Sequence, residues 1–111
     1  MSNCVEFVRF RVKEGQRSAF LARRADAIHA VQSAHPDLIG APVLAEHDDG
    51  SWTDVWIYRT AQAAERAGAD GDNIPAFVAM AELLDDVRIE VGAMPGGEDD
   101  GPIESKGRDR A

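Results

Sequence analysis

The chain has 111 residues, a formal net charge of −8 and a single cysteine. This length suits one domain with one hydrophobic core. Phosphate binding needs a concentrated positive surface, whereas the basic residues here are scattered, so nucleic acid and anionic membrane surfaces are not expected partners. Cys4 stands alone, which excludes an intrachain disulfide and a cysteine metal site, and we expect it to serve as a small apolar residue.

The sequence also bears on location. No positive segment followed by an apolar run opens the chain, so we expect no signal peptide. No stretch approaches the roughly 20 apolar residues of a membrane span. We therefore expect a cytoplasmic protein.

The first half of the chain predicts a strand, a helix and a connector. Residues 5–12 alternate, with Val8, Phe10 and Val12 on one face. Residues 16–35 have the apolar spacing of a helix, with Phe20, Leu21, Ala25, Ile28, Val31 and Gln32 near one face. Pro36 ends this helix, because the residue before a proline is pushed out of the helical region. Residues 37–40 are then expected to connect to the next strand.

The second half contains a hairpin, an interrupted helix and a last strand. Asp48-Asp-Gly50-Ser is a hairpin turn signal. The predicted elements are strands at 41–48 and 52–60, helical pieces at 61–67 and 75–84 separated by a break at 68–73, and a strand at 87–91. The break is either a flexible lid or an acidic loop.

This order of elements predicts the fold class. Strand–helix–strand–strand–helix–strand is the α+β, ferredoxin-like βαββαβ arrangement. It implies a four-stranded antiparallel sheet with both helices on one face. We assign residues 1–94 to this domain. Residues 95–111 lose all periodicity and are expected to form a flexible acidic and polar tail.

The strand at 52–60 carries large apolar side chains on both faces. Trp52, Trp56 and Tyr58 share one face, and Val55 and Ile57 take the other. One bare face of this kind would leave a sizeable apolar patch in water. We therefore predict a homodimer formed sheet on sheet. The alternative is a monomer whose bare sheet receives a ligand or another protein.

Several segments resemble one family. The pattern Val8-Arg-Phe-Arg-Val-Lys-Glu-Gly15 followed by a long helix, the segment Val55–Ala64, and the closing Val87-Arg-Ile-Glu-Val91 resemble the antibiotic biosynthesis monooxygenase family of dimeric α/β barrels. The resemblance covers about residues 4–94. Members typically carry Trp-Glu-Ser or a close variant where this chain has Tyr58-Arg59-Thr60.

The resemblance implies a range of activities. Some members oxygenate polyphenolic, anthrone-like substrates without metal or flavin, and others degrade haem. The fold also serves lactone isomerases and stress-response proteins, so fold does not fix function. The expected reaction is cofactor-independent, and no cofactor is expected to be needed. The alternative is a non-catalytic dimeric domain that binds a small ligand or a protein.

The candidate substrate-binding residues are Trp56, Tyr58, Phe77 and Asn73. The aromatic residues are expected to line a closed, mostly apolar cavity for a small aromatic or polyketide-type ligand, and the alternative is that they are plain core residues. Asn73 lies in the helix break, where it is either a pocket rim or a helix cap.

The candidate catalytic residues are His47 and Arg9. His47 is the best placed of the three histidines for proton transfer, but its position just before Asp48-Asp49 favours the alternative of a surface histidine near the turn. Arg9 has apolar neighbours, so it needs either a ligand or an ion pair with Glu46, Asp54 or Glu90. No histidine pair has metal-ligand spacing, and no His–Asn pair suggests haem, so no metal site is expected.

Overall fold

The computed structural model describes residues 2–95. Its elements in chain order are β1 (Asn3–Val12), α1 (Arg17–Ala34), β2 (Leu38–Glu46), β3 (Ser51–Tyr58), α2 (Ala61–Asp70), the 3-10 turn η1 (Gly71–Asn73), α3 (Pro75–Ala81) and β4 (Leu84–Met94). The predicted tail at 95–111 falls, apart from Pro95, outside the described residues.

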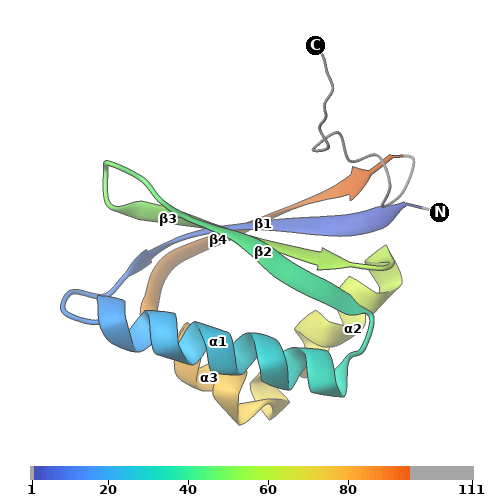
Figure 1. Cartoon of the computed structure of the whole chain (residues 1–111), viewed down its shortest axis with the longest axis horizontal. Helices are drawn as coiled ribbons and strands as arrows, with labels where there is room; N and C mark the ends of the chain where they lie inside the picture. Colours follow the sequence, from blue (N-terminus) through green and yellow to red (C-terminus); the bar gives the residue numbers. More distant parts are fainter. Residues whose placement is uncertain (1, 96–111) are drawn as a thin grey trace.

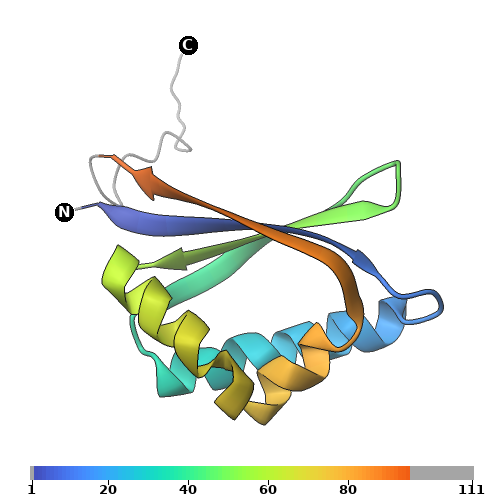
Figure 2. The ribbon, with the colours of Figure 1, turned by 180° about the vertical axis from the view of Figure 1, so that it is seen from behind.

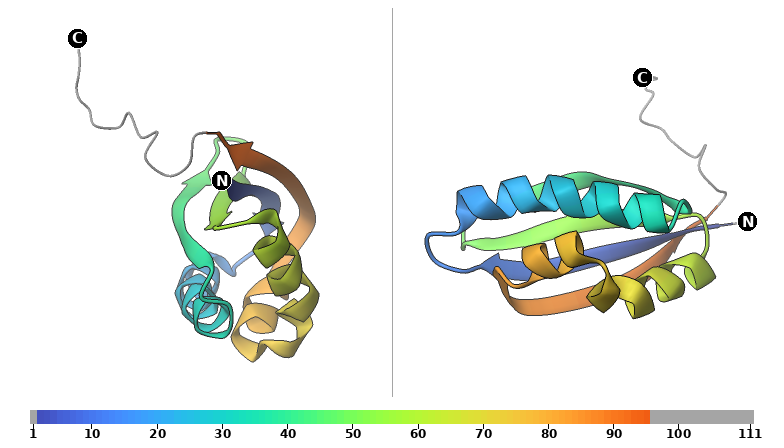
Figure 3. Two further views of the ribbon diagram at one scale, coloured as in Figure 1. Left: turned by 90° about the vertical axis from the view of Figure 1, so that its right-hand side faces the viewer. Right: turned by 90° about the horizontal axis from the view of Figure 1, so that it is seen from below.

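The strands form one antiparallel sheet in the order β2-β3-β1-β4. The helices all lie on one face of this sheet, with α1 beside the α2–η1–α3 segment (Figures 1 and 3). The predicted ferredoxin-like α+β fold is confirmed. In the central register, Val8 of β1 lies opposite Asp54 of β3 and Ile89 of β4, so these three side chains share one face.

All four strands begin earlier than the sequence indicates, and the difference is largest for β2 and β4. The connector predicted at 37–40 is wrong, because β2 begins at Leu38, whose side chain is 0% exposed and which pairs with Tyr58. Gly40 obscured the start of this strand, and the register shifts on either side of it. Glycine and proline weaken a strand pattern, and they are common where a strand is irregular.

β4 runs from Leu84 to Met94, whereas only 87–91 was predicted. Its pairing with β1 shifts between Arg9 and Arg11, and Asp86 there has a φ of 56°. A residue in the left-handed region is typical of a bulge, which increases strand bending. Figure 2 shows the result: β4 curls strongly out of the sheet towards α3.

The helices also differ in detail from the prediction. The buried residues of α1 are Phe20, Ala27 and Val31, whereas Leu21 is 38% exposed and Gln32 is exposed. α2 extends to Asp70, so the break is confined to η1 and Ile74. Thr60 caps α2, with its Oγ1 accepting a hydrogen bond from Ala63 N at 3.0 Å. Among the helices of residues 2–95, none has the length and apolar character needed to cross a membrane.

Trp52 belongs to the core. Its ring stacks on Phe10 at 6.3 Å between centroids and meets Phe20 edge-on at 5.4 Å. Phe10 and Phe20 also meet edge-on, at 5.3 Å. This cluster joins β1, β3 and the start of α1, and it fixes one end of the space between sheet and helices.

Candidate substrate cavity

A mostly apolar cavity of about 330 Å³ lies between the sheet and the helices. Its walls come from β1, β3 and β4 on the sheet side and from α1, α2 and α3 on the helix side. Ligand pockets in proteins typically hold about 300–1,000 Å³, so this one suits a small molecule. The cavity lies where the aromatic residues Trp56, Tyr58 and Phe77 were predicted to meet, and all three line it.

Phe77 reaches Trp56 because a glycine leaves room for its ring. The two rings meet edge-on with centroids 6.4 Å apart and an interplanar angle of 87°. A Cβ atom on Gly71 would lie 3.1 Å from Phe77 Cε2, closer than side chains normally pack. The turn η1 therefore positions one aromatic wall of the cavity.

The cavity is open rather than closed. Val87 and Ile89 line it from β4 and are 50% and 59% exposed. β4 is an edge strand of the sheet, and in Figure 2 it runs along the near side of the molecule. An apolar opening of this kind admits an apolar molecule without burying a charge.

Asp54 is one of two carboxylates that line the cavity. It is buried and accepts two hydrogen bonds from Arg24 of α1, Nε to Oδ2 at 2.9 Å and Nη2 to Oδ1 at 2.7 Å. Arg24 Nη2 also donates to the carbonyl of Ala41 at 2.9 Å. Asp54 is thus fully engaged in a structural ion pair, and its charge is balanced.

Glu6 is the other carboxylate. It projects from β1 beside Val8, it is half-buried, and no ion pair or side-chain hydrogen bond links it to another of residues 2–95. Burial raises the pKa of its carboxyl. Glu6 was not among the residues predicted from the sequence. It lies two residues before Val8 in β1, so its side chain points to the same face as Val8 and Phe10, the face that the helices cover.

Tyr58 is buried next to the charge of Glu6. Burial raises the pKa of its hydroxyl, and the neighbouring Glu6 carboxyl and Cys4 thiol act in the same direction. The phenol therefore stays protonated at neutral pH and can donate a hydrogen bond. Cys4 is itself buried, and burial raises the pKa of its thiol, which fits the predicted role of a small core residue.

Known proteins resemble this chain in structure, but none was found that resembles it in sequence. No protein-family model and no curated protein matches. Among solved structures, a protein from Bordetella bronchiseptica assigned to the antibiotic biosynthesis monooxygenases matches with a TM-score of 0.69 at 14% identity, covering 83% of this chain and 96% of that one. This chain has the fold of the antibiotic biosynthesis monooxygenases.

Two further structures support this assignment of the fold. One from Chloroflexus aurantiacus, assigned to the same group, matches with a TM-score of 0.65 at 16% identity, covering 90% of this chain and all of that one. SnoaB from Streptomyces nogalater, a cofactor-independent oxygenase, matches with a TM-score of 0.62 at 20% identity, covering 86% of this chain and 94% of that one. These identities establish the fold alone.

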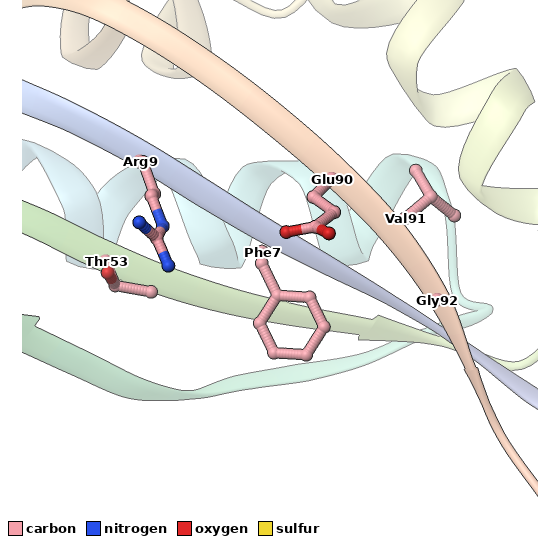
Figure 4. A pocket seen from close by; sticks show the side chains of 6 residues that line it. All are labelled: Phe7, Arg9, Thr53, Glu90, Val91 and Gly92. Atoms are coloured by element: carbon pink, nitrogen blue, oxygen red, sulfur yellow. The ribbon is translucent and has the colours of Figure 1, made fainter.

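Arg9 lies on the opposite face of the sheet from the cavity. With Phe7, Thr53 and Glu90 it lines a shallow groove on the outer face, and Figure 4 shows these side chains with α1 behind the strands. It forms no ion pair with another of the described residues. Two of its predicted partners are taken: Glu46 pairs with Arg17 and Asp54 with Arg24.

His47 also lies away from the cavity. Its Nε2 is 2.7 Å from Thr53 Oγ1, at the exposed end of the β2–β3 hairpin. A catalytic role for His47 and Arg9 stays a prediction, and it requires a substrate on the outer face. The structure thus brings together the aromatic candidates and separates them from the polar ones.

Asn73 does not line the cavity either. Its Nδ2 donates to Asp70 Oδ1 at 3.1 Å, and Asp70 Oδ2 lies 2.8 Å from His35 Nε2. This chain of contacts fastens η1 to the end of α1. The hydrogen bond with His35, and to a smaller extent the one from Asn73, lowers the pKa of the Asp70 carboxyl.

Within residues 2–95 there is no group of three or more His, Cys, Asp or Glu side chains able to hold a metal ion.

Proposed function

We propose that the protein is a cofactor-independent monooxygenase acting on a small hydroxylated aromatic or polyketide-type substrate. The observation that carries this proposal is the apolar cavity bounded by Trp56, Tyr58 and Phe77. Its presence on a fold shared with SnoaB, a cofactor-independent oxygenase, supports the reaction class.

The aromatic walls suit a flat, electron-rich ligand. Trp56 and Phe77 offer ring faces and edges for offset or edge-on packing against aromatic rings. The protonated hydroxyl of Tyr58 can donate to an oxygen on which negative charge develops. These groups bind and orient the substrate, and molecular oxygen is the oxidant.

Oxygen uptake with a hydroxyanthrone tests this proposal. We expect consumption of oxygen that depends on the protein and falls at least about 10-fold in Trp56→Ala, because a large stacking surface is lost. Trp56→Phe keeps a ring and should lose less, and Leu21→Ala, at an exposed residue of α1, should match the wild type. Binding of the hydroxyanthrone with no oxygen uptake would refute the reaction.

We also propose that the protein works as a homodimer joined through the outer face of the sheet. Phe7 and Val43 are 39% and 49% exposed there, and Val55 and Ile57 on the same face are only partly covered. Burial of such surface against a second sheet is favourable by about 25 cal/mol per Å². Arg9 would then lie at or near the interface.

A non-catalytic binding domain is the second candidate. It is favoured by the position of His47 and Arg9 outside the cavity. It predicts ligand binding beside Trp56 that leaves the ligand chemically unchanged in air. Analysis of the ligand after incubation distinguishes the two candidates.

A further inference from the structure

We infer that Glu6 is the general base of the cavity, the group that takes a proton from the bound substrate. This inference rests on the proposed function and names the group that starts the reaction. Its basis is geometric: Glu6 is the cavity carboxylate without a partner among residues 2–95, in a wall that is otherwise apolar apart from Asp54 and Tyr58.

The other polar groups of the cavity cannot take this role. Both oxygens of Asp54 accept hydrogen bonds from Arg24, so a proton added there would break a buried ion pair. The hydroxyl of Tyr58 is protonated and has no free base character near neutral pH. Within residues 2–95 no side-chain hydrogen bond or ion pair engages the oxygens of Glu6, and burial gives it a greater proton affinity than a carboxylate in water.

The proton transfer is balanced without a cofactor. For an anthrone, the C–H bond at the methylene carbon between the rings breaks, and its electron pair delocalises onto the carbonyl oxygen. The proton joins a carboxylate oxygen of Glu6, which becomes a neutral carboxylic acid. The charge thus moves from Glu6 to the ligand, where the Tyr58 hydroxyl can stabilise the oxyanion, and the total charge of the cavity is unchanged.

Few titratable groups among the described residues face Glu6. On the sheet they are the neutral Tyr58 hydroxyl and Cys4 thiol, on which the Glu6 carboxylate acts electrostatically, and the Asp54 carboxylate with its Arg24 partner from α1. Glu65 of α2 acts on Cys4. The residues that β4 and α3 contribute to the cavity wall are apolar: Val87, Ile89, Phe77, Met80, Ala81 and Leu84. The ionisation of Glu6 is therefore governed mainly by burial, and catalysis should rise with pH as this carboxyl loses its proton.

Anaerobic titration with a hydroxyanthrone tests the inference apart from oxygenation. The bound anion absorbs at longer wavelength than the neutral ligand, so its formation is visible without oxygen. We expect the wild type to form the anion, and Glu6→Gln to bind the neutral ligand at least as tightly while forming the anion at least about 100-fold more slowly. Glu6→Asp should fall between them, and Glu65→Gln, which removes an equal charge outside the cavity, should match the wild type.

Each outcome decides one claim. Anion formation that is unchanged in Glu6→Gln, with the near-ultraviolet signal of the tryptophans retained, overturns the inference. Ligand binding by the wild type without anion formation also overturns it. Anion formation by the wild type that depends on Glu6, combined with no oxygen uptake in air, supports the inference and overturns the proposed function. No binding of the hydroxyanthrone overturns both.

Discussion

Arg24 and Asp54 form a two-pronged ion pair that ties α1 to the middle of the sheet, with N···O distances of 2.9 and 2.7 Å. Their side chains are only 15% and 3% exposed. The pair closes one side of the cavity and neutralises one of its two carboxylates. In the part of the chain that the structure describes, it leaves Glu6 as the cavity carboxylate without an ion-pair partner, which is the group that we propose as the base.

Arg24→Ala should destabilise the fold strongly. It leaves the Asp54 carboxylate buried without a partner, and breaking such a pair typically costs about 3–5 kcal/mol. Urea unfolding measures the loss. Arg59→Ala is the matched control, since Arg59 forms an exposed pair with Asp37 at 3.8 Å and should change the free energy of unfolding by less than about 1 kcal/mol. Equal effects of the two variants would contradict this account of the pair.

Gly71→Ala should weaken ligand binding more than Gly68→Ala. A methyl at Gly71 meets the Phe77 ring at 3.1 Å and must displace it from Trp56, whereas a methyl at Gly68 meets no heavy atom within 4 Å. Gly68 also lies within α2, where alanine stabilises by up to about 1 kcal/mol. Quenching of tryptophan fluorescence by the hydroxyanthrone gives both affinities. Identical affinities would mean that the position of Phe77 does not matter for binding.

Phe7→Asp should shift the protein towards monomer, and Leu21→Asp should not. The two side chains are 39% and 38% exposed, but Phe7 lies on the outer face of the sheet and Leu21 on α1. A charge is costly only where the surface becomes buried in the dimer. Sedimentation velocity reports the mass of each variant. A monomeric wild type, or a dimer insensitive to Phe7→Asp, would refute the sheet-on-sheet arrangement.

Stability should fall in acid partly through Asp70. Its pKa in the folded protein lies below its ordinary value near 3.8, mainly because of the hydrogen bond from His35. The contribution of Asp70 to the free energy of unfolding is therefore fully present above the pKa of this carboxyl in the unfolded chain. It is lost as the pH falls through the lower pKa of the folded protein. Thermal melts between about pH 5 and pH 2 should show a smaller decline for Asp70→Asn than for the wild type. Asp72→Asn, on an exposed neighbour, should leave the decline unchanged.

Much of the fold could be predicted from period-two patterns. The parity of Trp52, Trp56 and Tyr58 placed them correctly on one face, and Phe77 was expected to line a cavity with Trp56 and Tyr58. The alternation of residues could not predict which of these aromatic side chains pack in the core and which line the cavity. Trp52 joins Phe10 and Phe20 because α1 covers that end of the sheet, whereas Trp56 borders open space.

The polar residues were harder to place for a physical reason. β1 carries apolar residues on both faces, so its pattern alone does not say which face the helices cover. The sequence therefore left open whether the face of Arg9 is enclosed, and the structure places Arg9 on the outer face. Glu6 shares its face with Val8 and Phe10, and parity alone could have placed it in the cavity. The alternation of Glu6 with the apolar residues Val8 and Phe10 along β1 is the pattern that could have indicated a carboxylate in the cavity.

Oxygen uptake with a blocked cavity tests the central claim most directly. Gly68 lines the cavity with room for a side chain, so Gly68→Leu should fill the cavity while Gly68→Ala leaves it open. We predict hydroxyanthrone-dependent oxygen uptake by the wild type and Gly68→Ala, and a loss of at least about 10-fold in folded Gly68→Leu. Equal uptake by all three proteins would place the reaction elsewhere, and no uptake by the wild type would contradict the proposed oxygenase.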